Sequence, residues 1–116
     1  MTDKQVLFDF TPDFDFTEDV RFKYVLLETS EQRLLVRGWT RAEFHADVAE
    51  ESERREKIKC TVIGGGRIHV NNKRILVYGH SLGFPWPPGH PRNQLVAELI
   101  RQNMTDMQVT WSNDGY

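Results

Sequence analysis

Short stretches of alternating apolar and polar residues, joined by polar turns, recur along this chain. Residues 22–29 put Phe22, Tyr24 and Leu26 on one face of an extended strand and the intervening side chains on the other. Residues 34–39 form a second strand, and the polar residues between the two suit an antiparallel connection. A period of two does not fit a helix, so this part of the chain is predicted to form a sheet.

The C-terminal half repeats this pattern. Strands are predicted over residues 60–63, 67–70, 74–78 and 108–111. Three glycines end the first of them, and we interpret the run as a bulge or tight bend. The Asn-Asn-Lys sequence before residue 74 suits a tight hairpin, because asparagine tolerates a positive φ.

The N-terminal segment alternates phenylalanines with acidic residues over residues 1–20. This spacing predicts a short edge strand whose acids face water, and the alternative is an acidic docking arm. Residues 1–11 are expected to form a flexible arm.

Two helices are predicted between the strands. The first has a Thr-x-x-Glu capping box at Thr40 and continues to about residue 57, with a start nearer His45 as the alternative. The second begins after Pro91 and carries an apolar stripe to about residue 103. Prolines make residues 79–89 irregular. The pattern predicts a mixed, mostly antiparallel sheet with helices on its faces.

Length and charge exclude several classes of protein. With 116 residues the chain can build one hydrophobic core, so we expect a single domain over residues 1–116. Its 15 basic and 17 acidic side chains nearly cancel, which excludes polybasic binding to nucleic acid or to a membrane as the main function. The lone cysteine, Cys60, cannot form an internal disulfide, and no apolar stretch is long enough to span a bilayer. Without a secretion signal, the chain is expected to be cytoplasmic.

Three catalytic motifs are matched only superficially. Gly79-His80-Ser81-Leu82-Gly83 has the G-x-S-x-G form of a serine hydrolase, but the prolines that follow prevent the required helix, and no acid lies between Ser81 and His90. The glycine run at residues 64–66 leads into a strand, unlike a phosphate-binding loop. Cys60 and Arg67 lie one residue too far apart for a cysteine phosphatase, so Cys60 is predicted to be structural.

The histidines are the remaining candidates for chemistry. His45, His69, His80 and His90 have no metal-ligand spacing, so no metal or other cofactor is expected. His45 lies near a predicted helix start, where free amides attract anions and an imidazole can exchange protons near neutrality. On these grounds alone, a structural role for His45 stays open.

Six sequence blocks, taken together, carry a resemblance to a known family. The chain resembles the protein histidine phosphatase family, which includes the Janus and ocnus proteins of insects, from about residue 12 to the C-terminus. The blocks, in order, are Phe22-Lys23-Tyr24-Val25-Leu26, Val36-Arg37-Gly38, Ala42-Glu43-Phe44-His45-Ala46-Asp47, Gly64-Gly65-Gly66-Arg67-Ile68, Val77-Tyr78-Gly79-His80-Ser81 and Val109-Thr110-Trp111-Ser112-Asn113-Asp114-Gly115-Tyr116.

The resemblance implies both a fold and an activity. The fold would be α/β of the α+β type, a six-stranded mixed, mostly antiparallel sheet flanked by two helices. The activity would be metal-independent removal of phosphate from phosphohistidine in proteins, which some members extend to phospholysine. The partners would be phosphohistidine-containing proteins, and we expect a monomer that binds neither nucleic acid nor membranes.

The resemblance also assigns roles to residues. His45 would be catalytic, as a general base or as a nucleophile, and the sequence does not choose between them. Backbone amides at the helix start and in the loop after Ser81 would hold phosphoryl oxygens. The residues that would bind the phosphate are Lys23, Arg67 and Ser81, with the backbones of His45, Ala46 and Gly83.

Residues 82–90 depart from the family pattern. Family members commonly have a shorter loop here, with a small residue, then tyrosine and glycine, whereas this chain has Trp86 and three prolines, and His80 stands where tyrosine is common. These changes affect the expected substrate preference more than the expected chemistry. They also leave a second hypothesis, a regulatory protein that binds phosphorylated partners without turnover. Arg37 either helps to bind substrate or ties the sheet together, and we favour the structural role.

Overall fold

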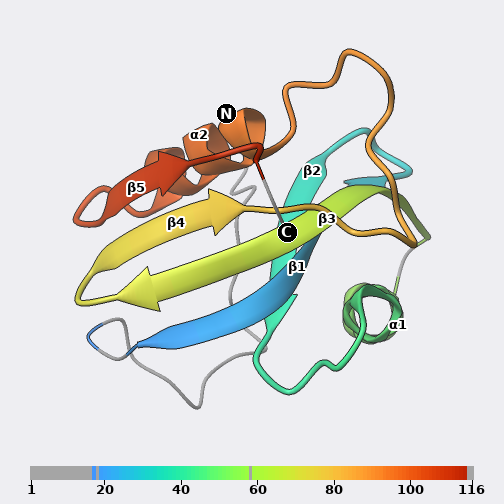
Figure 1. The fold of residues 1–116 in the computed structure, drawn as a ribbon. Helices are drawn as coiled ribbons and strands as arrows, with labels where there is room; N and C mark the ends of the chain where they lie inside the picture. Colours follow the sequence, from blue (N-terminus) through green and yellow to red (C-terminus); the bar gives the residue numbers. More distant parts are fainter. Residues whose placement is uncertain (1–16, 18, 58, 115–116) are drawn as a thin grey trace.

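Five strands form one mixed sheet with two helices in the computed structural model, which describes residues 17, 19–57 and 59–114 (Figure 1). The strand order is β2-β1-β3-β4-β5. All neighbouring strands are antiparallel except β4 and β5, which are parallel. The elements are β1 (Val20–Thr29), β2 (Leu34–Trp39), α1 (His45–Glu56), β3 (Cys60–Asn71), β4 (Arg74–Tyr78), α2 (Asn93–Asn103) and β5 (Gln108–Trp111).

The connections follow from local sequence and from strand direction. Asn72 and Lys73 have φ angles of 52° and 64°, as the predicted hairpin between β3 and β4 requires. The parallel pairing of β4 with β5 needs a crossover, and α2 supplies it. Within the described residues, no helix is long and apolar enough to cross a membrane.

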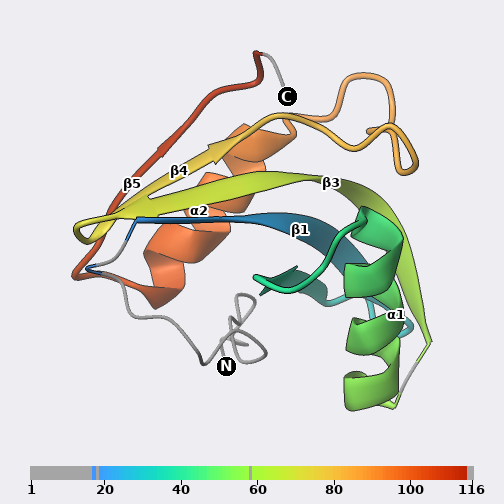
Figure 2. The same ribbon diagram turned by 60° about the horizontal axis from the view of Figure 1, so that its bottom comes forward.

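The two helices cover opposite faces of the sheet. Phe22, Tyr24 and Leu26 are buried in the larger core together with the apolar stripe of α2. Val25 and Leu27, which point the other way, pack in a smaller core with residues of β2 and α1. Figure 2 shows α2 running along one face, and α1 at the end of the sheet where β3 bends. The two-faced pattern predicted for this strand is therefore confirmed.

Two boundaries predicted from the sequence are wrong. The helix α1 begins at His45, the alternative start, and not at the capping box of Thr40. The N–H of Ala42 donates to the Trp39 carbonyl oxygen, 3.2 Å away, and so forms a turn before the helix. The side chain that caps the helix is that of Asp47 rather than Glu43. The segments predicted as separate strands, 60–63 and 67–70, are one strand, β3. The glycines stay extended because they pair with β1.

The predicted number of strands therefore exceeds the number found. A bulge does occur beside the glycines, because Leu26 pairs with Gly64 while Leu27 pairs with Val62. The arm predicted at residues 1–11 and nearly all of the edge strand predicted within residues 1–20 lie outside the described residues.

Candidate active site

A cavity of about 560 Å³ lies where the start of α1, the middle of β1 and β3, and the loop after β4 meet. Residues predicted from the sequence to form a site lie in each of these elements, and the structure brings them together. The cavity is lined by Lys23, His45, Ala46, Arg67, Ser81 and Gly83, which are the six predicted site residues, and by Phe44, His80, Leu82 and Phe84.

Two cations form one wall of this cavity. Lys23 in β1 lies directly opposite Arg67 in β3, so both side chains project from the face opposite α2. The Nη1 atom of Arg67 is buried and has no hydrogen-bond partner among the described residues. Among the described residues, no aspartate or glutamate lines the cavity. Like charges on directly opposed residues destabilise a sheet, so the pair favours an anionic ligand that would neutralise it.

The His45 imidazole is held in one orientation. It is the first residue of α1 and is only 9% exposed. Its Nε2 atom lies 2.8 Å from the Gly66 carbonyl oxygen, which can only accept, so Nε2 carries the proton and donates. In the neutral ring, Nδ1 therefore keeps its lone pair. This tautomer suits a proton acceptor or a nucleophile.

The surroundings of His45 also favour its neutral form. Burial lowers the pKa of the imidazole below its ordinary value of 6.5, and the hydrogen bond to Gly66 opposes this shift. The positive charges of Lys23 and Arg67, and His80, lower the pKa further. At neutral pH the ring is consequently a free base, and the two cations beside it favour this form.

The start of α1 adds donors for an anion. The N–H of Phe44 donates to the Asp47 carboxylate at 3.0 Å, whereas the amides of His45 and Ala46 have no acceptor in the described part of the chain. Free amides and the positive end of the helix dipole attract negative charge. The structure thus brings the predicted backbone donors next to the two cations.

Glycine at residue 65 allows the site to close. A side chain at Gly65 would point at the His45 ring and at Ser81, and its neighbours Gly64 and Gly66 lie against the Trp86 ring and the Tyr24 ring. The glycine run is therefore explained by close approach on both faces of β3 as well as by the bulge. This role was not predicted from the sequence, although glycines inside a strand are a signal for such close approach.

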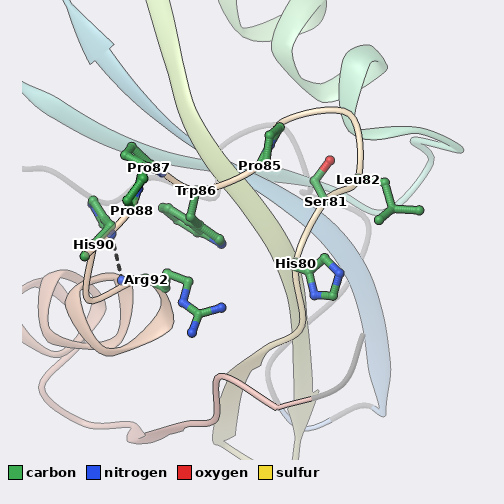
Figure 3. Close-up of a pocket in the computed structure, with 10 residues that line it drawn as sticks. His80, Ser81, Leu82, Pro85, Trp86, Pro87, Pro88, His90 and Arg92 are labelled. Atoms are coloured by element: carbon green, nitrogen blue, oxygen red, sulfur yellow. Dashed lines mark hydrogen bonds between the residues drawn. The ribbon is translucent and has the colours of Figure 1, made fainter.

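The loop after β4 is ordered by its own polar groups. The Oγ atom of Ser81 accepts a hydrogen bond from the Phe84 N–H at 3.2 Å, and Ser81 is buried. At the base of the loop, Asn93 donates to the Gly79 carbonyl at 2.9 Å and accepts a hydrogen bond from the Tyr24 hydroxyl. These contacts fix the loop that carries His80, Ser81 and Leu82 (Figure 3).

The rim of the cavity is apolar, a feature that the sequence analysis missed. Three large hydrophobic side chains in the described chain are exposed, and two of them, Phe44 at 61% and Leu82 at 77%, line this cavity. The third, Trp111, lies in β5. Arg37, by contrast, is buried and is not among the lining residues, in agreement with a structural role.

Comparison with known proteins gives the family. The model of the Janus/Ocnus family matches residues 9–108. A 14 kDa phosphohistidine phosphatase of Sus scrofa is 37% identical, over 90% of this chain and 92% of the relative, and one of Homo sapiens is 34% identical, over 90% and 93%. The sex-regulated protein janus-A of Drosophila pseudoobscura pseudoobscura is 29% identical, over 90% of this chain and 77% of the relative. The chain belongs to the Janus/Ocnus family.

Proposed function

We propose that the protein is a phosphatase that hydrolyses the P–N bond of phosphohistidine in proteins. The observation that carries this proposal is a neutral imidazole with a free Nδ1 lone pair, at the edge of a pocket whose lining, over the part of the chain that the structure describes, has two cations and no carboxylate. The names of two relatives, both phosphohistidine phosphatases, support it.

The proposed chemistry divides the work between charge and proton transfer. Lys23, Arg67, the Ser81 hydroxyl and the amides of Ala46 and Gly83 would hold the phosphoryl oxygens. The imidazole of phosphohistidine is a good leaving group once its ring is protonated, so P–N cleavage demands less from the enzyme than cleavage of a phosphate ester. Charge stabilisation and one proton acceptor then account for the reaction, and no metal is required in the proposal.

His45 has two possible roles in this reaction. As a general base, Nδ1 takes a proton from water while the water oxygen bonds to phosphorus and the P–N electron pair leaves with the substrate imidazole. As a nucleophile, Nδ1 bonds to phosphorus itself, and water later cleaves the new P–N bond. Stopping the reaction with denaturant at alkaline pH, where the P–N bond of phosphohistidine survives, and looking for radiolabelled phosphate on His45 separates the two roles.

The apolar rim supports a protein substrate. Phe44 and Leu82 stand exposed at the mouth of a charged pocket, where a small phosphoramidate would leave them in water. A phosphohistidine on a protein surface brings apolar neighbours that can cover them.

Single-domain organisation, a monomeric state and a cytoplasmic location belong to the same proposal.

The test is phosphate release from a chemically phosphorylated histidine peptide in the presence of a metal chelator. The proposal predicts turnover of this peptide and none of a phosphoserine peptide of the same sequence. The second hypothesis, a protein that binds phosphorylated partners without hydrolysis, is favoured by the altered 82–90 loop and by the relative named sex-regulated protein janus-A. Binding of the phosphohistidine peptide without any turnover would decide for that alternative.

A further inference from the structure

A second cavity of about 560 Å³ adjoins the candidate active site, and no role has yet been assigned to it. Both cavities are lined by His80, Ser81 and Leu82, so this short segment is a common wall. The opposite wall is the proline-rich stretch that departs from the family pattern, ending at Arg92, the residue before α2. Figure 3 shows this cavity and the side chains around it.

Of the described residues that line this second cavity, Arg92 alone has a permanent charge. Its guanidinium makes no hydrogen bond or ion pair with any described residue, although the side chain is partly buried. In Figure 3 it points from the α2 end toward the side of the cavity where Trp86 and His80 lie. A cation that lines a cavity without a counter-ion attracts an anion that can reach it.

The backbone holds Arg92 in this orientation against its preference. Its φ and ψ angles are 59° and −123°, a conformation that favours glycine. The His90 Nδ1 atom fixes the turn by accepting the Arg92 N–H at 2.7 Å. Backbone strain of this kind persists where the surrounding structure over-determines the conformation, and it is enriched at binding sites.

The cavity wall beside Arg92 includes the Trp86 ring, which is held by packing on its other sides. The Trp86 and His90 rings stack with their centroids 4.8 Å apart, and Trp86 packs against Gly64 and the larger core. A ligand for this cavity therefore combines an anionic end for Arg92 with a short apolar part for the Trp86 side. The side chains of glutamate and aspartate have this chemistry.

We propose that the second cavity binds an acidic side chain that lies near the phosphohistidine in the substrate protein, and that Arg92 determines this preference. The inference rests on the proposed function, because the shared wall puts the occupant of one cavity beside the occupant of the other. The recognised partner is therefore a protein segment with phosphohistidine and a neighbouring carboxylate.

A peptide series tests this site by binding. One glutamate is moved from three residues before to three residues after the phosphohistidine, and each peptide is paired with its glutamine counterpart. The dissociation constants are measured with the His45→Ala variant, so that the result does not depend on turnover. At one or two adjacent positions we expect the glutamate peptide to bind about five- to tenfold more tightly, since one charge-assisted contact is gained.

Variants assign the preference to Arg92. Arg92→Gln, in the same background, should abolish the difference between glutamate and glutamine peptides, and Arg92→Lys should keep part of it. Arg92→Gly provides a second variant that adopts the positive φ without strain and should behave like Arg92→Gln. Arg74→Gln is the control, because it removes the same charge at an exposed residue of β4, away from the cavity; it should leave the preference intact.

Two results would overturn the inference. One is equal binding of glutamate and glutamine peptides at every position, and the other is a glutamate preference that survives Arg92→Gln and Arg92→Gly. Failure of the proposed function looks different, because it is an absence of phosphate release from all peptides by the unmodified protein, whatever their binding.

Discussion

Replacing Gly65 by alanine perturbs the candidate site with a single methyl group. The added Cβ atom would lie 2.8 Å from the Tyr24 carbonyl oxygen, 2.9 Å from Cδ2 of His45 and 3.3 Å from Cβ of Ser81. The Tyr24 carbonyl belongs to β1 in the interior of the sheet and cannot move freely. The His45 ring must therefore shift, which lengthens the 2.8 Å hydrogen bond to Gly66.

The expected magnitudes follow from these contacts. Overpacking of this kind typically lowers the free energy of unfolding by about 1–3 kcal/mol. A displacement of a reacting group by about 1 Å costs about a hundredfold in rate, so kcat for a phosphohistidine peptide should fall by about that factor. Urea denaturation gives the stability change, and a phosphate-release assay gives kcat.

Gly83→Ala is the matched control, because the nearest atom to its added Cβ is the Ser81 Oγ at 4.0 Å. Both variants add one methyl group to a glycine of the same site, but only one has a neighbour in the way. A wild-type kcat in Gly65→Ala would contradict the reasoning that close packing against β3 positions the His45 ring. Equal losses of kcat in the two variants would contradict it as well.

Three further predictions concern charge, rim and pH. Lys23→Ala should raise KM for phosphohistidine peptides by about tenfold, because Lys23 binds phosphate in the proposal. It should also shift the acid limb of the kcat/KM profile to higher pH, because Lys23 lowers the pKa of His45. An unchanged pH profile would contradict this effect of Lys23 on the pKa of His45. Leu82→Ser should raise KM for a phosphohistidine protein severalfold but leave hydrolysis of free phosphoramidate unchanged. The control Trp111→Ser should change neither. If Leu82→Ser affected both substrates equally, the apolar rim would have no role in recognising a protein substrate. Because burial holds the pKa of His45 below 6.5, the unfolded chain binds more protons just below that pH, so stability falls as the solution is acidified through this range. Urea denaturation of His45→Gln should show a weaker loss of stability on acidification, and an unaltered pH dependence would exclude the lowered pKa.

Sequence patterns predicted those features of the fold that depend on neighbouring residues. The alternation in residues 22–29 separated the two cores because side chains of a strand point to opposite faces. The hairpin before Arg74 followed from the tolerance of asparagine for a positive φ. The helix start predicted from the Thr40 capping box was wrong, because residues 39–42 form a separate turn and the helix begins only after it.

The geometry of the candidate site depends on contacts between distant residues, and these lay beyond prediction. The six site residues came from family resemblance, while their convergence on one cavity depends on strand register, which pairs Lys23 with Arg67. The tautomer of His45 is set by the carbonyl of Gly66, 21 residues away along the chain. The continuity of β3 through its glycines likewise requires the pairing with β1, which no local pattern shows.

In the proposed mechanism, the neutral imidazole of His45 drives P–N hydrolysis in a cationic pocket. The direct measurement is phosphate release from a phosphohistidine protein, with chelator present, by the unmodified protein and by His45→Ala, with circular dichroism of both. We expect turnover by the unmodified protein, none by His45→Ala, and the same native spectrum from both. Undiminished turnover by a folded His45→Ala variant would contradict it.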